Sequence, residues 1–422
     1  MESVLFKGPW VAGVGEADVG VRDGRIALVG RAEAGDRYDR IIEADGCALI
    51  PGLVNCHGHA AMTLFRGIAD DLPLRRWLEE KIWPLEAKLT AECVYWGSML
   101  AMAEMIRGGT TTFTDMYFFE EETARAAEEA GMRAVLSRGL AVGPNLHNAL
   151  RENRQLAEEW HQRGDGRITV QLGPHALYTC PPRQLEPILD LAAELDLALQ
   201  IHVAETKEEV EESIARYGKS PVAVLEETGL FQFPVLAAHC VHVSEEDIGI
   251  LARNKVHVSH NPVSNLKLGS GIAPVPQMLA AGMIVGLGTD GASSNNNLDM
   301  FLEMRMAALI HKGIANDPTL VPAGLALEMA TSLGAKALFL EDVGSIEEGM
   351  KADITLIDLN QVHLSPRHDP CAAIAYAAKA SDVTLVMADG RILLEEGRLT
   401  TIDEERTIYE AQRCLRALQE QL

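Results

Sequence analysis

Two histidines separated by a single glycine, His57 and His59, are the residues whose spacing most directly suggests chemistry. They follow an apolar run at 48–50 that is typical of a short buried strand. Side chains two positions apart on a strand point to the same face, so both imidazoles can reach one point. Neutral imidazoles bind transition metals such as zinc and iron(II). The pair alone does not define a metal site, and its meaning depends on the elements around it.

Eight short apolar segments alternate with helical patterns through the middle of the chain. The helical stretches between them, such as 120–131, 187–195 and 206–217, carry charged faces. A strand followed by a helix, repeated eight times, is the pattern of a parallel (β/α)8 barrel, the TIM barrel. The expected strands are 48–56, 110–116, 133–140, 168–175, 198–203, 235–240, 255–260 and 284–289.

Further polar residues stand where these expected strands end. The first strand ends at the histidine pair, and the fourth, fifth, sixth and eighth end at His175, His202, His239 and Asp290. Active sites of such barrels lie at the C-terminal ends of the strands. A purely structural histidine has no reason to choose those ends. The sequence therefore predicts a metal site at this rim of the barrel.

The polar residues at the rim divide into metal ligands and a group that handles water. His239 is expected to hold the water by hydrogen bonding, and the alternative is a histidine that serves only the core. The segment 168–180 contains no lysine that could bridge two ions, so one divalent metal is expected. Zn²⁺ is the first choice, and Fe²⁺ or Mn²⁺ would suit the same nitrogen and oxygen donors. The predicted ligands, which leave a position open for water, are His57, His59, His202 and Asp290.

Glu205 lies three residues after His202, just beyond the fifth expected strand. A carboxylate in that place can take a proton from water and pass it to a substrate atom nearby, so Glu205 is a candidate catalytic residue. Its position separates it from the acids of the following helix, which are expected to be solvated: Glu208, Glu209, Glu211 and Glu212.

The two ends of the chain have a different pattern from the middle. Residues 1–47 and 343–400 alternate short strands with turn signals such as Asp-Gly, and 403–422 has the pattern of a closing helix. We expect both ends to assemble one small β-sandwich. The expected domains are therefore a composite β-sandwich with a C-terminal helix, 1–50 and 343–422, and a catalytic barrel, 51–342.

Composition excludes several kinds of partner. The formal net charge of −24 would repel a nucleic-acid backbone or an anionic membrane, and an anionic substrate would need a local arginine. No apolar run reaches the roughly 18 residues that span a bilayer, and the N-terminus lacks the pattern of a signal peptide. Seven scattered cysteines without a Cys-x-x-Cys pair are typical of a reduced, cytoplasmic protein.

Several short motifs together resemble a known family. They are Pro-Gly-Leu-Val-Asn-Cys-His-Gly-His at 51–59, His-Val-Ala-Glu at 202–205, Ala-His-Cys at 238–240 and Gly-Thr-Asp at 288–290. This set resembles the amidohydrolase superfamily, specifically its mononuclear aminohydrolase branch, over essentially the whole chain. Finer similarity, at 259–274 and 291–299, is to enzymes that act on 5′-methylthioadenosine and S-adenosylhomocysteine.

The resemblance implies a hydrolytic deamination at C6 of an adenine nucleoside that is modified at its 5′ position, with adenosine as a further candidate substrate. The family's metal ligands fall on the four residues named above. Its proton-shuttling glutamate falls on Glu205, and Asp290 also orients the attacking water. Of the substrate-binding residues, Glu86 corresponds to the ribose-binding glutamate, His175 to a substrate-binding histidine and Arg138 to an arginine near the 5′ substituent. A second arginine most nearly meets Arg151, although the loop 141–150 differs in length by a residue.

Two alternatives remain open on the sequence alone. One is an aminohydrolase of the same barrel that acts on a free base or another heterocycle: guanine, 8-oxoguanine, a pterin or an s-triazine. The other is a barrel that has lost catalysis and serves as a scaffold, which the complete ligand set disfavours. The sequence leaves the oligomeric state, including a homo-oligomer, open.

Overall fold

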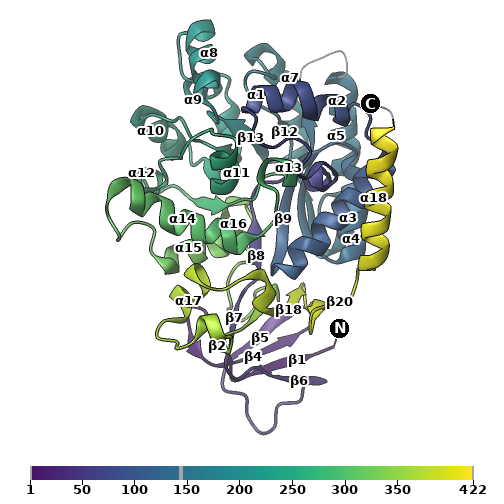
Figure 1. Cartoon of the computed structure of the whole chain (residues 1–422), viewed down its shortest axis with the longest axis vertical. Helices are drawn as coiled ribbons and strands as arrows, with labels where there is room; N and C mark the ends of the chain where they lie inside the picture. The colour runs from purple at the N-terminus through teal and green to yellow at the C-terminus, as the bar shows by residue number, and fades with distance from the viewer. Residues whose placement is uncertain (1, 142–145, 421–422) are drawn as a thin grey trace.

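The computed structural model describes residues 2–141 and 146–420. It contains a barrel of parallel strands surrounded by helices, with two further sheets below the barrel (Figure 1). The parallel strands and the helices between them agree with the expected barrel. Its strands are β8 (Leu53–Asn55), β9 (Thr110–Tyr117), β10 (Arg133–Leu140), β11 (Ile168–Val170), β12 (Gly173–Pro174), β13 (Leu199–Val203), β14 (Val235–His239), β15 (His257–His260) and β16 (Val285–Leu287).

Two parallel sheets, β11-β10-β9-β8 and β13-β14-β15-β16, close into the barrel through backbone hydrogen bonds. On one side, the Leu172 N–H donates to the Ala198 carbonyl at 2.9 Å. On the other side, the Cys56 N–H donates to the Leu287 carbonyl at 2.8 Å, and the Asp290 N–H to the His57 carbonyl at 2.9 Å. Closure therefore brings the first and last strands together at the rim that carries the predicted ligands.

The expected first strand, 48–56, is divided in the structure. Its first half is β7 (Cys47–Pro51), which pairs antiparallel with β17 (Ile354–Asp358) outside the barrel, and its second half is β8. Gly52 lies at the division, where a Cβ atom would come within 2.1 Å of the Thr111 hydroxyl oxygen. Because only glycine fits this close approach, the chain can pass from one sheet to the other here. The fourth expected strand is likewise divided into β11 and β12.

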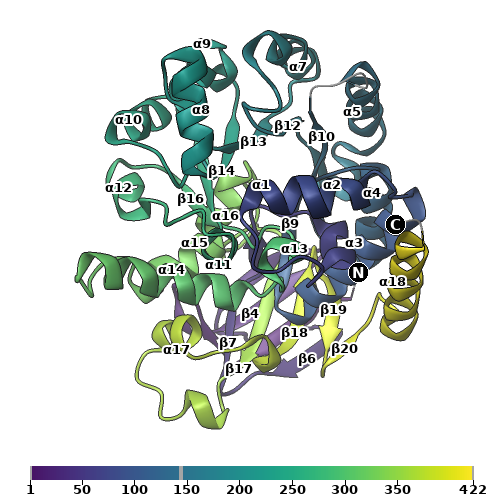
Figure 2. The ribbon, with the colours of Figure 1, turned by 45° about the horizontal axis from the view of Figure 1, so that its top comes forward.

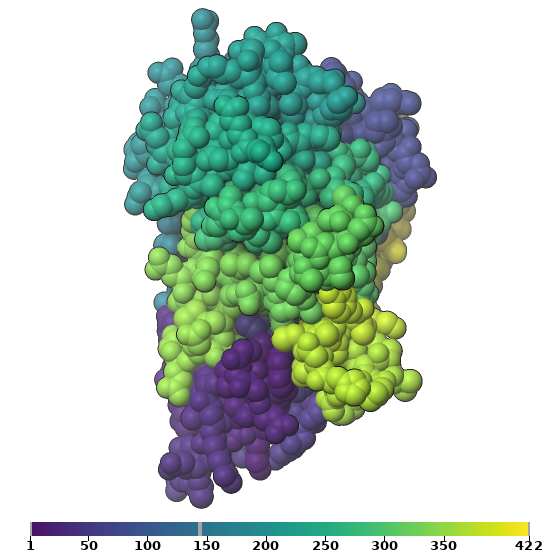
Figure 3. All heavy atoms as spheres, turned by 90° about the vertical axis from the view of Figure 1, so that its left-hand side faces the viewer, coloured from purple at the N-terminus to yellow at the C-terminus, as the bar shows by residue number. Residues whose placement is uncertain are grey.

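Both ends of the chain contribute to the two sheets below the barrel. One has the order β5-β4-β1-β6, and the other β20-β19-β18-β17-β7-β2-β3. Their shared apolar core includes Phe6, Val19, Ile354 and Met387. Figure 3 shows N-terminal and C-terminal segments side by side at this end of the molecule. The remaining bounds are β1 (Val4–Lys7), β2 (Trp10–Val11), β3 (Gly15–Glu16), β4 (Asp18–Arg22), β5 (Arg25–Gly30), β6 (Arg40–Glu43), β18 (Val383–Ala388), β19 (Arg391–Glu395) and β20 (Arg398–Leu399).

The helices cover the outside of the barrel, and a few short ones cover its mouth. Figure 2 shows α1 and α2 in front of the strands, over the rim that carries the histidines. The short mouth helices are η1 (Ala60–Phe65), α1 (Leu74–Trp77), η2 (Leu78–Ile82) and α2 (Trp83–Glu86). The others are α3 (Ala91–Arg107), α4 (Glu120–Ala130), α5 (Leu146–Trp160), α6 (Arg163–Gly166), α7 (Pro182–Leu195), α8 (Lys207–Tyr217), α9 (Pro221–Glu227), η3 (Leu230–Gln232), α10 (Glu245–Arg253), α11 (Pro262–Lys267), α12 (Val275–Ala280), α13 (Ala292–Asn295), α14 (Met300–Ala315), α15 (Ala323–Ala330), α16 (Ser332–Ala337), η4 (Val362–Leu364), α17 (Pro370–Tyr376), η5 (Ala380–Asp382) and α18 (Glu404–Gln419).

The C-terminal helix α18 packs on the barrel helix α3. It buries Ala411, Cys414 and Leu418 in the apolar cluster beneath the mouth helices. Arg413 forms an ion pair with Glu92 across this contact. Among the residues that the structure describes, no helix has the length and apolar character needed to cross a membrane.

Candidate active site

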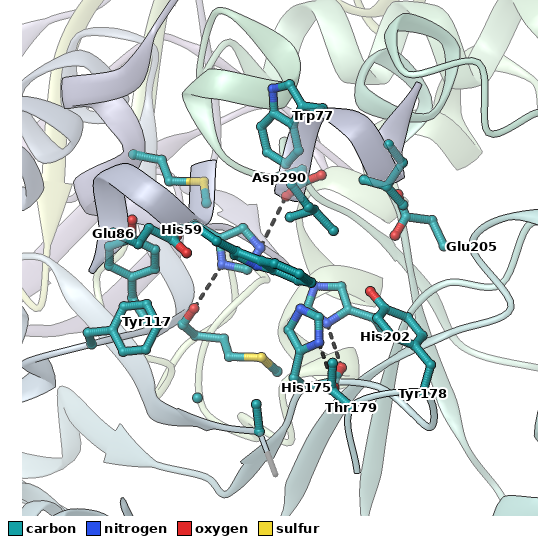
Figure 4. Close-up of a pocket in the computed structure, with 18 of the residues that line it drawn as sticks. His59, Trp77, Glu86, Tyr117, His175, Tyr178, Thr179, His202, Glu205 and Asp290 are labelled. Atoms are coloured by element: carbon teal, nitrogen blue, oxygen red, sulfur yellow. Dashed lines mark hydrogen bonds and ion pairs between the residues drawn. The ribbon is translucent and has the colours of Figure 1, made fainter. Parts of the chain in front are cut away.

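The predicted metal ligands meet at the C-terminal rim of the barrel. The ligand nitrogens of His57, His59 and His202 lie within 4.8 Å of one another, and so do the ligand atoms of His57, His239 and Asp290. Asp290 Oδ1 is 3.3 Å from His59 Nε2 and 3.7 Å from His57 Nε2 (Figure 4 shows the contact with His59). The two groups share His57 and therefore adjoin one another.

Backbone carbonyls orient two of the candidate ligand histidines. His59 Nδ1 donates to the Met116 carbonyl at 2.8 Å, and His202 Nδ1 donates to the His175 carbonyl at 2.7 Å. Each ring therefore keeps its Nε2 lone pair for the centre of the site. His57 Nε2 is buried and has no hydrogen-bond partner within the described part of the chain, as a nitrogen reserved for a metal would be. Burial and neighbouring histidines hold the pKa values of His57 and His202 well below the usual range, which favours the neutral, metal-binding form.

Asp290 is held as a carboxylate directly after β16. Its Oδ2 accepts a hydrogen bond from the Ser264 hydroxyl at 2.6 Å, and its Oδ1 accepts one from the Gly291 N–H at 2.7 Å. Burial favours the neutral acid, but His59, His239 and these two donors outweigh it and lower the pKa of Asp290. A φ of 62° places the residue in the left-handed region, a strain that is typical of functional sites.

His239 ends β14 with its ring turned toward the same centre. Its Nδ1 donates to Asn265 Oδ1 at 2.8 Å, which leaves Nε2 facing Glu205, 3.9 Å from Oε2. Burial works against the charged ring, yet the carboxylates of Glu205 and Asp290 raise the pKa of His239 overall. The two carboxylates therefore favour a proton on the His239 ring. Its partner Asn265 was not singled out from the sequence, where nothing marks an asparagine 26 residues away as a partner.

Glu205 lies directly beyond β13 and is buried. Its Oε1 accepts a hydrogen bond from the Ser270 hydroxyl at 3.5 Å, and burial raises the pKa of its carboxyl group. Both features suit a group that takes up and releases protons. One expectation about the neighbouring acids was wrong. Glu208, Glu211 and Glu212 are exposed, but Glu209 is only 7% exposed, because its carboxylate accepts hydrogen bonds from the backbone.

A cavity of about 440 Å³ opens from this cluster toward the mouth helices. That volume suits a small molecule. Figure 4 shows His59, His202, Glu205 and Asp290 on its walls. The apolar and aromatic part of the lining consists of Met62, Leu74, Trp77, Leu78, Trp83, Met116, Tyr117, Phe118, Tyr178 and Leu268. The sequence analysis did not name the aromatic members as site residues, because aromatic residues are more often part of a core.

Two residues expected to hold substrate, Glu86 and His175, line the cavity. Burial raises the pKa of Glu86 to about 7, and the neighbouring Tyr117 hydroxyl opposes that rise. Burial, together with His59 and His239, lowers the pKa of His175 to about 4, so its ring is neutral. His175 Nδ1 forms a hydrogen bond with the Thr179 hydroxyl at 2.9 Å. Both side chains can therefore exchange hydrogen bonds with a bound molecule.

The two candidate arginines lie in different places. Arg138, at the end of β10, lines the cavity, while its Nε donates to Glu152 Oε2 at 2.8 Å and its guanidinium lies over the Phe118 ring. Arg151 lies on α5, is exposed, and is not among the described residues that line the cavity. The structure does not bring Arg151 to the site, because it projects from a solvent-facing position of that helix. Part of the adjoining loop, 142–145, lies outside the described residues.

Comparison with known proteins defines the class to which this fold and site belong. Residues 48–393 match the amidohydrolase family, and the chain belongs to that family.

Individual relatives are similar over nearly the full length. The chain is 53% identical over 406 residues to a 5-methylthioadenosine/S-adenosylhomocysteine deaminase from Desulforudis audaxviator, covering 95% of this chain and 94% of that one. A zinc-bound adenosine deaminase from Xanthomonas campestris superposes with a TM-score of 0.94 at 36% identity, covering 99% and 98% of the two chains. A zinc complex of an atrazine chlorohydrolase from Arthrobacter aurescens superposes with a TM-score of 0.90 at 26% identity, covering 98% of this chain and 100% of that one.

Proposed function

We propose that this protein is a metal-dependent aminohydrolase that removes the C6 amino group from 5′-modified adenosines and releases ammonia. The proposed substrates are 5′-methylthioadenosine and S-adenosylhomocysteine, with adenosine as a further candidate. The observation that carries the proposal is that His57, His59, His202 and Asp290 lie close together beside a cavity that Glu205 also lines. The 53% identity to a deaminase of that name supports the substrate class.

The proposed chemistry divides between a metal and three side chains. When bound, a divalent metal would lower the pKa of water and so make hydroxide available near neutral pH. His239 Nε2 and Asp290 would orient the attacking oxygen toward C6 of the purine. Glu205 would take a proton from the attacking water and give it to N1 as the tetrahedral centre forms, and would then carry the proton of the new C6 hydroxyl to the amino group, which leaves as ammonia. The raised pKa of Glu205 suits this exchange.

The remaining cavity residues would select the substrate. Glu86 and His175 are proposed to hold the ribose by hydrogen bonds, since both are polar members of the lining. Arg138 is proposed to meet the far end of the 5′ substituent. The apolar and aromatic lining from the mouth helices would contact the purine and the thioether. Arg151 is not part of this proposal, because it is exposed outside the cavity.

We also propose that the two lower sheets form one β-sandwich domain, made of residues 1–50 and 343–422, that supports the barrel at 51–342. The hairpin turns at Gly24 and Gly390 support this arrangement. A Cβ atom on Gly390 would come within 2.5 Å of the Gly24 Cα, so the turns from opposite ends of the chain are in close contact.

We expect one divalent metal, Zn²⁺ in the first instance, per chain. The two candidate ligand groups share His57 and adjoin one another, and 168–180 offers no lysine to bridge a second ion. Elemental analysis of the purified protein checks this stoichiometry. Two ions per chain that both survive dialysis would contradict it.

A second candidate function is hydrolysis of another heterocycle, such as an s-triazine or a free base. The similarity to a zinc-bound atrazine chlorohydrolase favours it. Ammonia release measured with 5′-methylthioadenosine, S-adenosylhomocysteine, adenosine, 5′-deoxyadenosine, guanine and cytosine separates the candidates. Our proposal requires the 5′-modified nucleosides to be the best substrates. Preferred turnover of a free base, or none of any nucleoside, would contradict it.

Arg138→Ala is expected to lower kcat/KM for S-adenosylhomocysteine far more than for 5′-methylthioadenosine. Only the first substrate ends in a carboxylate, and a hydrogen bond to a charged group contributes roughly 1.5–3 kcal/mol, which is about 10- to 150-fold in an equilibrium constant. The existing ion pair with Glu152 must open first, so the lower part of that range is expected. Steady-state kinetics on both substrates checks this prediction.

The matched control is Arg151→Ala, which removes an exposed arginine 13 positions after Arg138. It should leave kcat/KM unchanged for both substrates. Equal losses for the two substrates in Arg138→Ala would show that Arg138 serves only the ion pair at the rim.

A further inference from the structure

Glu209 is a buried acid in the first turn of α8, where the neighbouring acids Glu208, Glu211 and Glu212 are exposed. Its two carboxylate oxygens accept hydrogen bonds from two consecutive backbone N–H groups. Oε1 accepts from Ala204 at 3.0 Å, and Oε2 accepts from Glu205 at 2.9 Å. A single side chain thus holds both peptide groups of the turn that follows β13.

The turn that Glu209 holds is strained. Ala204 has a φ of 49°, in the left-handed region that is unfavourable for a residue with a Cβ atom. Such conformations persist where the surroundings fix them. The Thr206 hydroxyl accepts the Glu209 N–H at 3.2 Å, which anchors the first turn of α8 on the same loop. The strand end, the turn and the helix are thereby tied together through Glu209.

This turn decides where the Glu205 side chain lies. The contacts of the Glu205 carboxylate with other side chains are long, 3.5 Å to the Ser270 hydroxyl and 3.9 Å to His239 Nε2. A hydrogen bond of 3.5 Å is at the limit of such interactions. The backbone N–H of Glu205, in contrast, is held at 2.9 Å by Glu209. The position of the Glu205 carboxylate therefore depends mainly on its backbone.

We propose that Glu209 is a positioning residue for the reaction: it fixes the turn that aims Glu205 at the substrate. The proposal rests on the function proposed above, in which Glu205 transfers the proton. Only a carboxylate offers an acceptor oxygen to each of the two N–H groups, because a glutamine side chain places an NH₂ donor against one of them. Glu209→Gln should therefore release one N–H group while it keeps the size of the side chain.

The test is a double-mutant cycle measured as kcat, KM and bound metal for Glu209→Gln, Glu205→Gln and the double variant. Glu209→Gln should lower kcat by about 10- to 100-fold, the scale of a misplaced catalytic group. Its KM and metal content should stay unchanged. In the Glu205→Gln background, Glu209→Gln should lower kcat by no more than about twofold, since the group that Glu209 positions is already disabled. Glu208→Gln, at the exposed neighbouring position, is the matched control and should match the wild type.

Three results would overturn the inference. They are a kcat for Glu209→Gln within about twofold of the wild type, an equal loss in both Glu205 backgrounds, and a loss of bound metal that accounts for the lost activity. If Glu209→Gln does not fold, Thr206→Ala takes its place, because it loosens the turn of α8 that carries Glu209. It should then lower kcat only in the chain that retains Glu205, and equal effects in both chains would contradict the proposal.

A wild-type protein without deaminase activity would overturn the proposed function and this inference with it. An active wild type with additive losses of kcat would overturn this inference alone.

Discussion

Glu205→Gln is expected to lower kcat by about 10²–10⁴, the range for removal of a general acid/base. The amide has the same shape as the carboxylate but cannot take up the proton that the proposed reaction requires. Because Glu205 belongs to neither candidate group of metal ligands, the bound metal should be retained. The measurements are steady-state ammonia release with 5′-methylthioadenosine and elemental analysis of the same preparation.

Glu212→Gln provides the comparison for this variant. Glu212 lies on the exposed face of the same helix as Glu209, and its substitution should not change turnover. Activity of Glu205→Gln within about tenfold of the wild type would place the proton transfer on another residue, because even the lower limit for this kind of group is about 10².

Asp290→Ala is expected to lower kcat at least as much as Glu205→Gln does, by about 10²–10⁴ or more. The change removes a proposed ligand and a group that orients water, and it leaves the Ser264 hydroxyl and the Gly291 N–H without their acceptor. Metal affinity should fall by more than the roughly 10–100-fold that is typical for loss of an outer partner of a ligand. Competition with a chromophoric chelator measures the affinity, and ammonia release measures the activity.

Asp36→Ala is a suitable control for Asp290→Ala, since Asp36 is exposed in the N-terminal part of the chain, outside the barrel. It should leave metal affinity and turnover unchanged. An Asp290→Ala protein that binds metal as tightly as the wild type would show that Asp290 is not a ligand.

The alternation of apolar segments with helical patterns predicted the barrel because each strand is short and buried and is followed by a helix. The division of the first strand at Gly52 was not predictable from that pattern. Residues 48–56 were expected to form one strand, and only the contact of Gly52 with Thr111 shows why the chain changes sheets there. The contact between α18 and α3 is likewise a tertiary property that no local pattern contains.

The candidate site residues likewise differ in how well a local sequence pattern identifies them. His57, His59, His202 and Asp290 could be named as candidates because each lies at or just beyond the end of an expected strand. Glu86 entered only through the resemblance, since nothing in its short helix distinguishes it from an ordinary surface charge. Glu209 was misjudged although Thr206-x-x-Glu209 has the spacing of a helix capping box, a signal that predicts an acid turned back toward the backbone.

The proposed function requires that the protein removes the C6 amino group of an adenosine at this rim of the barrel with the help of one metal ion. The most direct measurement compares chelator-treated protein with the same protein reloaded with Zn²⁺, both acting on 5′-methylthioadenosine. The products are followed as ammonia and as the corresponding hypoxanthine nucleoside. We expect negligible turnover without metal, and equal amounts of both products after one ion per chain has been restored. Turnover that is unaffected by metal removal, or a reloaded protein that leaves the amino group in place, would contradict the account.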